Sequence, residues 1–265
     1  MTTLALREEP PERLDMSGIT PAALAGMSDM EIARLPVGTT RFRLALGDCF
    51  GVARGEPDRL VIKGGSTRLD RVAAGLTGGT VLVEGDVGQR LAEAMGGGTV
   101  HVMGSAGPFA ATAATAGNIT IHGDADVSAG GTVHGAMTGL NGATLCINGR
   151  GGDRLGDTMR SGLILVGTAG DFTGCRMIAG TIVCGALGAN PGYGMRRGTI
   201  LAREAGPLLP TFVRTGRQAS VIARILAISI REIAPDMAEL AVGPLERWAG
   251  DLATLGKGEI LLPLS

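Results

Sequence analysis

A glycine-punctuated repeat constrains this sequence more than any other feature. Three segments share the pattern Gly-x-x-Gly, then Met, then x-x-Gly followed by aliphatic or β-branched residues, and every marked position recurs after 18 residues. The three copies begin at Gly149, Gly167 and Gly185, and a copy with the same internal spacing begins at Gly85. Because residue type and spacing recur together, the pattern indicates a solenoid in which each repeat forms one coil.

Each copy of the repeat carries three marked glycines and one methionine. We expect the glycines at tight corners, where the backbone needs a positive φ or approaches a neighbouring coil closely. The methionines should fill the interior of the coils with an adaptable side chain. The marked residues are Gly85, Gly88, Gly98, Gly149, Gly152, Gly162, Gly167, Gly170, Gly180, Gly185, Gly188 and Gly198, with Met95, Met159, Met177 and Met195. Between the first and second copies the pattern loosens: Ala114 replaces Met, and about eight extra residues lie within 123–149.

A short aliphatic segment follows the last glycine of each repeat and predicts a β-strand. Val81 and Val83 alternate with other residues, as Val100 and Val102 do, which is the period of a half-buried strand. Such a strand buries its apolar face when the same strand is stacked on it in parallel register. The predicted strands are 80–84, 99–103, 118–122, 144–148, 163–166, 181–184 and 199–202.

The predicted fold is therefore mainly β, a right-handed parallel β-helix of about seven coils with helical caps at both ends. With 45 glycines among 265 residues and only 3 % aromatic residues, the chain suits a thin interior. The left-handed hexapeptide helix also has an 18-residue period. It needs an aliphatic residue in every hexapeptide, however, and the marked positions 0, 3, 10 and 13 do not divide in that way.

The segments on either side of the repeats are expected to cover the open ends of the solenoid. A helix over 20–35 should begin with Thr20 as its N-cap and Pro21 in its first turn. Near the other end, Ile225, Ile228 and Trp248 are among the residues that suggest helical periods. The predicted divisions are an N-terminal extension and cap (1–55), the β-helix (56–205) and a C-terminal helical cap (206–265).

The residues that usually carry chemistry are sparse. A net charge of −1 gives no broad field toward nucleic acid or a membrane, and no 18-residue apolar run is present. The four cysteines form no CxxC pair and the three histidines do not share a repeat position, so no metal site is expected. The charged N-terminus does not resemble a secretory signal, which suggests a cytoplasmic protein with reduced thiols. We predict no catalytic residue.

Two surface features suggest contacts with other molecules. Arg160, Arg176, Arg196 and Arg197 fall at similar repeat positions, so they could form an anion site for a partner's carboxylates or an anionic carrier tail. The alternative is solvated charge with local partners such as Asp157.

The second surface feature is an apolar outer wall. The segment 163–166 is apolar at four consecutive positions, so residues on both faces of that strand need cover. Leu163, Leu165 and Val183 should therefore contact either the C-terminal segment or a partner protein.

The repeat resembles the glycine-repeat β-helix found in the C subunit of formylmethanofuran dehydrogenase, which also occurs in the C-terminal domain of glutamate synthase. This resemblance covers residues 60–202. The flanking segments LALREEPPERL at 4–14 and WAGDLATLGKGEI at 248–260 are more similar to the free-standing C subunit of bacterial formyltransferase/hydrolase complexes.

The resemblance implies a non-catalytic structural subunit in tetrahydromethanopterin-linked one-carbon metabolism. Such a complex transfers the formyl group of formyl-tetrahydromethanopterin to a methanofuran-type carrier and releases formate. The implied partners are an amidohydrolase-like subunit, a formyltransferase subunit and a further subunit. The resemblance implies no cofactor on this chain, although a polyglutamyl carrier could be present in the complex.

Three other functions remain open at this point. The chain could be the C subunit of a molybdenum or tungsten formylmethanofuran dehydrogenase, which would make the complex an oxidoreductase. A carbohydrate-active β-helix enzyme would need a secretory signal and an Asp cluster, and we find neither. An interaction module unrelated to one-carbon chemistry is compatible with the periodicity alone.

Overall fold

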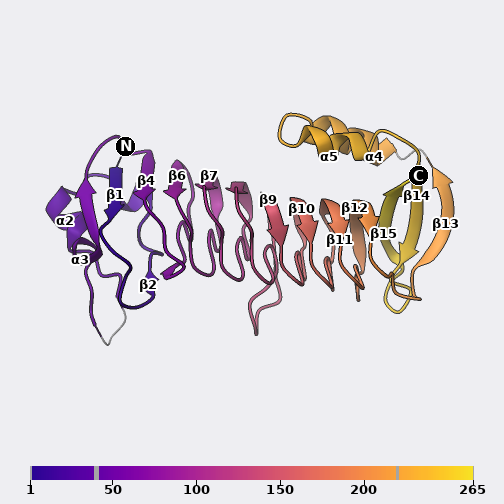
Figure 1. Cartoon of the computed structure of the whole chain (residues 1–265), viewed down its shortest axis with the longest axis horizontal. Helices are drawn as coiled ribbons and strands as arrows, with labels where there is room; N and C mark the ends of the chain where they lie inside the picture. Colours follow the sequence, from indigo (N-terminus) through magenta and orange to yellow (C-terminus); the bar gives the residue numbers. More distant parts are fainter. Residues whose placement is uncertain (1, 39–41, 219–220, 265) are drawn as a thin grey trace.

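The computed structural model describes residues 2–38, 42–218 and 221–264. The molecule is elongated, and its strands are stacked side by side along the long axis (Figure 1). A single sheet of 13 strands runs through the whole stack, and ten of these strands pair in parallel. In spatial order they are β3 (Phe50–Ala53), β1 (Thr2–Leu6), β4 (Arg59–Lys63), β6 (Thr80–Glu84), β7 (Gly96–Val102), β8 (Ala116–Ile121), β9 (Asn141–Gly151), β10 (Ser161–Ala169), β11 (Thr181–Leu187), β12 (Arg197–Ala205), β15 (Lys257–Pro263), β14 (Leu245–Gly250) and β13 (Val213–Gln218).

All seven segments predicted as strands form strands, β6 to β12, and each pairs in parallel with the next. The register repeats at matching positions, so Val81 lies beside Val100 and Ile164 beside Ile182. The parallel stack is longer than predicted, because β4 and β1 extend it at one end and β15 extends it at the other. The fold is thus a β-helix-like stack of parallel strands.

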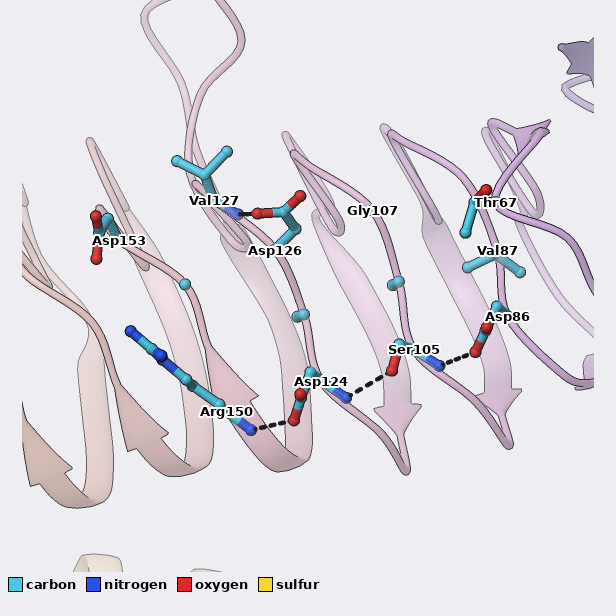
Figure 2. A pocket seen from close by; sticks show the side chains of 13 residues that line it. Thr67, Asp86, Val87, Ser105, Gly107, Asp124, Asp126, Val127, Arg150 and Asp153 are labelled. Atoms are coloured by element: carbon cyan, nitrogen blue, oxygen red, sulfur yellow. Dashed lines mark hydrogen bonds between the residues drawn. The ribbon is translucent and has the colours of Figure 1, made fainter.

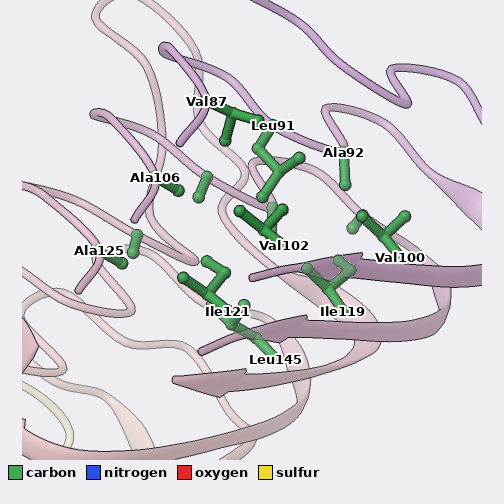
Figure 3. Close-up of a cluster of buried hydrophobic side chains, with 14 of the residues drawn as sticks. Val87, Leu91, Ala92, Val100, Val102, Ala106, Ile119, Ile121, Ala125 and Leu145 are labelled. Atoms are coloured by element: carbon green, nitrogen blue, oxygen red, sulfur yellow. The ribbon is translucent and has the colours of Figure 1, made fainter. Parts of the chain in front are cut away.

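Parts of the core are narrow because large aliphatic side chains on the strands face small side chains from the opposite wall, although Val87 and Leu91 also point inward from that wall. Val102 and Ile121 point inward from the strands, while Ala106 and Ala125 approach from the other side (Figure 3). The opposite wall is held in parallel register by isolated bridges between Val87, Ala106, Ala125 and Gly151. This pairing of aliphatic with small residues explains why the chain needs so few aromatic residues.

The methionines and the last glycines of the repeat interlock between neighbouring coils. Met159 and Met177 are fully buried. A Cβ atom added at Gly180 would lie 2.7 Å from the Met159 methyl carbon, and one added at Gly198 would lie 2.8 Å from that of Met177. Gly180 and Gly198 also have φ values of +104° and +112°, which favour glycine. The methionine of one coil therefore occupies the space that a side chain of the next coil would fill.

The helix predicted over 20–35 is wrong as a single element. Two short helices form instead, α1 (Pro21–Leu24) and α2 (Asp29–Ala33). Thr20 caps α1 as expected, since its hydroxyl accepts a hydrogen bond from the Ala23 amide. The helix ends because Ala25 has an extended backbone, and Gly26 follows it with a φ of +83°. A capping box between Ser28 and Glu31 then starts α2.

The remaining elements of the N-terminal region are short. They are α3 (Leu46–Cys49) and β2 (Leu14–Asp15). Strand β2 pairs with β5 (Leu69–Asp70), a strand beyond residue 55, in a separate two-stranded sheet. The N-terminal region is therefore a mixture of strands and helices, not a helical cap.

The predicted helical cap over 206–265 is not confirmed as a whole. Only α4 (Val221–Ile230) and α5 (Pro235–Leu240) are helical among its described residues, and Trp248 lies on β14. Strand β15 adds to the stack because its Ile260 and Leu261 continue the buried columns of β12. Strands β14 and β13 then pair antiparallel beyond it, so strands close this end of the sheet.

Candidate interaction surfaces

One column of residues points outward from the strands, and its character changes along the molecule. Neighbouring strands bring these residues into register, from β6 through β12 to β15. In order the column is Leu82, His101, Thr120, Cys146, Leu165, Val183, Leu201 and Leu261. The first three are partly exposed, whereas the last five are buried.

Helices α4 and α5 cover the apolar part of this column. Leu165 and Val183 are fully buried in a cluster with Ala227 and Ile230 of α4 and Leu240 of α5. Leu163 is partly buried and packs against the same cluster. Figure 1 shows both helices beside this end of the stack. Of the two expected covers for the outer wall, the structure therefore places the C-terminal segment over these three residues.

The four predicted arginines do not act as one group. Arg160 and Arg196 hold equivalent places two coils apart, just before β10 and β12, and Arg197 is the first residue of β12. Arg176 instead lies in a turn and pairs with the buried Asp157. The local partner named in the sequence therefore holds one of the four arginines.

Asp157 also binds Arg154, an arginine that the sequence reasoning missed. The Arg154 side chain donates to an Asp157 carboxylate oxygen at 2.7 Å, and the Arg176 Nε donates to the other oxygen at 2.9 Å. Burial raises the pKa of Asp157, but the hydrogen bonds from Arg176 and Arg154 outweigh it and hold the pKa below its usual value. The ionised carboxylate neutralises one of the two guanidinium groups, so this cluster keeps a net positive charge.

Arg154 belongs to a column of turn residues with a left-handed backbone, which we call the turn edge. Glycine is the usual residue at positive φ, so this column could not be recognised from the sequence. Its members with a positive φ are Arg71, Arg90, Phe109, Ser128, Arg154, Phe172 and Asn190. Arg176 also has a positive φ, four residues after Phe172 in the same turn.

A hollow of about 540 Å³ follows a ladder of polar residues along another corner of the coils. The Ser105 amide donates to Asp86 at 2.8 Å, and the Arg150 amide donates to Asp124 at 2.8 Å (Figure 2). The Ser105 hydroxyl accepts from the Asp124 amide between them. These side chains satisfy backbone groups of the next coil, so the ladder has a structural role.

Aspartate side chains that accept from backbone amides of the next coil, on this ladder and elsewhere in the turns, explain several marked glycines of the repeat. A Cβ atom added at Gly149 would clash with a carboxylate oxygen of Asp124, and one added at Gly188 would clash with a carboxylate oxygen of Asp171. Gly88 and Gly170 have the same relation to Asp70 and Asp153.

The other marked glycines meet backbone atoms or have a positive φ. A Cβ atom would contact neighbouring backbone at Gly85, Gly98, Gly152, Gly162, Gly167 and Gly185. Among these, Gly98 has a φ of +90° and Gly162 of +98°. Close approach between coils is thus a more frequent reason for these glycines than backbone conformation.

Within the described residues, no group of three or more His, Cys, Asp or Glu side chains is arranged to hold a metal ion. Burial raises the pKa of the Cys175 and Cys184 thiols to about 12. No helix in the described part of the chain has the length and apolarity needed to cross a membrane.

Comparisons with known proteins find close relatives across the full length. No protein-family model matches the chain. It is 56 % identical over 264 residues to the Fhc C subunit of the formyltransferase/hydrolase complex of Methylorubrum extorquens strain AM1, covering 99 % of this chain and 100 % of that protein. Among solved structures, it matches a chain of the X-ray crystal structure of the formyltransferase/hydrolase complex (FhcABCD) from Methylorubrum extorquens in complex with methylofuran. That match has a TM-score of 0.96 and 57 % identity, over 99 % of this chain and 100 % of the other.

Proposed function

This chain belongs to the family formed by the C subunit of the formyltransferase/hydrolase complex, and from that premise we propose that it is a non-catalytic structural subunit of such a complex. The observation that carries the proposal is 56 % identity over 99 % of the chain, which includes both flanking segments as well as the repeats. The similarity supports this function and not the molybdenum or tungsten dehydrogenase alternative.

The complex would transfer the formyl group of formyl-tetrahydromethanopterin to a methanofuran-type carrier and release formate. The similar solved complex contains methylofuran, which supports a carrier of this class. An amidohydrolase-like subunit, a formyltransferase subunit and a further subunit would be the partners, in the cytoplasm.

In this complex the chain would act as a rigid spacer. Ten strands in parallel register, about 4.8 Å apart, make a hydrogen-bonded rod about 43 Å long. A rod of this kind can hold two active sites of other subunits at a fixed separation while a carrier moves between them. We also infer a right-handed winding, because about 98 % of parallel crossover connections within a sheet take that hand.

The test separates the coupled reaction from its two halves. The complex is purified from its native cell with and without this chain. Formyl transfer to the carrier, hydrolysis of the formylated carrier and formate release from formyl-tetrahydromethanopterin are then assayed separately.

A spacer predicts that both half reactions persist without the chain while coupled formate release falls. Loss of either half reaction on substitution of a polar residue of this chain, in a complex that still assembles, would contradict the non-catalytic role.

A further inference from the structure

The turn edge gathers aromatic side chains in a chain that has very few. One Trp, one Tyr and five Phe are present, and three of these seven, Phe109, Phe172 and Tyr193, line two hollows on this edge. Phe172 is 37 % exposed and Tyr193 is 53 % exposed. Their rings contact each other edge to face with centroids 6.1 Å apart. Exposed aromatic side chains of this kind are typical of protein interfaces.

Two arginines form the ridge between the hollows. Arg154 and Arg176 line both hollows, which have volumes of about 280 and 240 Å³. Their side chains are 45 % and 51 % exposed, and Asp157 neutralises only one of the two charges. Each guanidinium group has five N–H donors, so donors remain for a carboxylate from outside.

The long insertion of the repeat extends the same surface. Residues 131–139 form a loop between β8 and β9 that protrudes on the opposite side of the molecule from α4 and α5 (Figure 1). The His134 ring contacts Phe109 edge to face with centroids 5.7 Å apart, and Met137 is 78 % exposed. The apolar surface therefore continues from Tyr193 across the arginines to this loop.

The backbone at these positions is unfavourable for the residues that occupy it. Phe172 has a φ of +57° and Arg154 of +59°, whereas Asn190 holds the equivalent place in the next coil with a φ of +56°. Asn adopts this conformation more readily than Phe or Arg. The same backbone recurs at every member of the turn edge, so the fold imposes it, and Phe172 holds a bulky ring there that remains 37 % exposed.

We propose that this part of the turn edge, formed by Phe109, Arg154, Phe172, Arg176 and Tyr193, is the docking surface for an acidic segment of a partner protein. The unneutralised guanidinium charge selects carboxylate side chains, and the aromatic rings accept an apolar side chain beside them. The proposal rests on the proposed function, since it takes the partner to be another subunit of the complex.

The test uses a variant that relieves strain while it removes the docking group. Phe172→Asn installs the residue found at the equivalent place in the next coil, so thermal unfolding of the full chain should be unchanged or shifted upward. Combined with Tyr193→Ala, it should weaken association with the remaining subunits at least tenfold, most clearly at high salt, where the attraction by Arg154 and Arg176 is screened. The matched control is Ile228→Asn on α4, an exposed apolar residue (70 %) on another face, which should leave association unchanged.

A photo-crosslinking residue at position 193 of the intact complex identifies the occupant. The expected product joins this chain to a partner peptide that contains Asp or Glu. Three results would overturn the proposal. The first is a double variant that associates with the other subunits as tightly as the wild type does, and the second is weakened association of the Ile228→Asn variant. The third is a double variant that loses binding of a synthetic oligoglutamate but still assembles normally into the complex. Failure of the spacer function is read separately, from coupled formate release in a complex whose assembly is intact.

Discussion

The contact between Met177 and Gly198 predicts a measurable coupling between neighbouring coils. Met177 is fully buried, so Met177→Ala should destabilise the chain by about 3 kcal/mol. In Gly198→Ala the residue would keep its φ of +112°. Its new Cβ would lie 2.8 Å from the Met177 methyl carbon and 2.9 Å from the Gly180 carbonyl oxygen. A φ of +112° lies beyond the left-handed α region and costs about 2 kcal/mol for a residue with a Cβ, and the two contacts raise the total to about 3 kcal/mol.

Removal of the methionine side chain relieves one of those two contacts but not the other. The double variant should therefore be about 1 kcal/mol more stable than the sum of the single changes predicts. The assay is urea unfolding of the full chain, monitored by circular dichroism. The wild type, the two single variants and the double variant are compared with the same dependence of unfolding free energy on urea concentration.

Gly75→Ala is the matched control for the backbone contribution. Gly75 has a φ of +65°, but an added Cβ would meet no atom within 4 Å. This variant should lose only about 1 kcal/mol. Equal losses at positions 75 and 198, or strict additivity in the cycle, would refute the idea that methionine and glycine interlock between coils.

Three further predictions follow from burial and charge. Leu165→Ala should lower the free energy of unfolding by about 3 kcal/mol and speed trypsin cleavage within α4, because Leu165 lies under the helices. The control is Leu82→Ala, in the uncovered part of the same column, which should lower the free energy of unfolding less and leave cleavage unchanged. Asp157 has a lowered pKa in the folded chain, so its contribution is complete above about pH 4 and is lost as the pH falls through the folded pKa. Asp157→Asn should cost about 2 kcal/mol at pH 7 and flatten the acid side of a plot of stability against pH; an unchanged slope would contradict this reasoning. Cys175 and Cys184 should resist iodoacetamide at pH 8 in the folded chain and react in urea, as mass spectrometry would record; rapid modification without urea would show that these thiols are accessible.

The exposed arginines show which contacts at the candidate surfaces could be predicted from the sequence and which could not. Arg176 was identified from its place in the repeat, and Asp157 was named as a local partner. The role of Arg154 was not foreseen, although it lies only three residues before Asp157, because its turn has a left-handed backbone at a residue other than glycine. Phe172 and Tyr193 were missed because isolated aromatic residues in turns carry no periodic signal.

The sequence by itself determined the repeated part of this protein. Strands recur because alternating aliphatic residues return with the coil period. Only parallel stacking can bury all of these residues, so the local pattern also determines which strands pair. The apolar run at Leu163–Val166 likewise indicated that its outer face would be covered.

Only the tertiary structure decided what lies outside that period. Residues 257–263 pair with β12 after an excursion of two strands and two helices, and no local pattern records which distant segment takes that place. The end segments do not share the repeat, so nothing in the repeat specifies their partners. The reason for each marked glycine was also decided there, because the atom that excludes a side chain belongs to the neighbouring coil and not to the glycine's own turn.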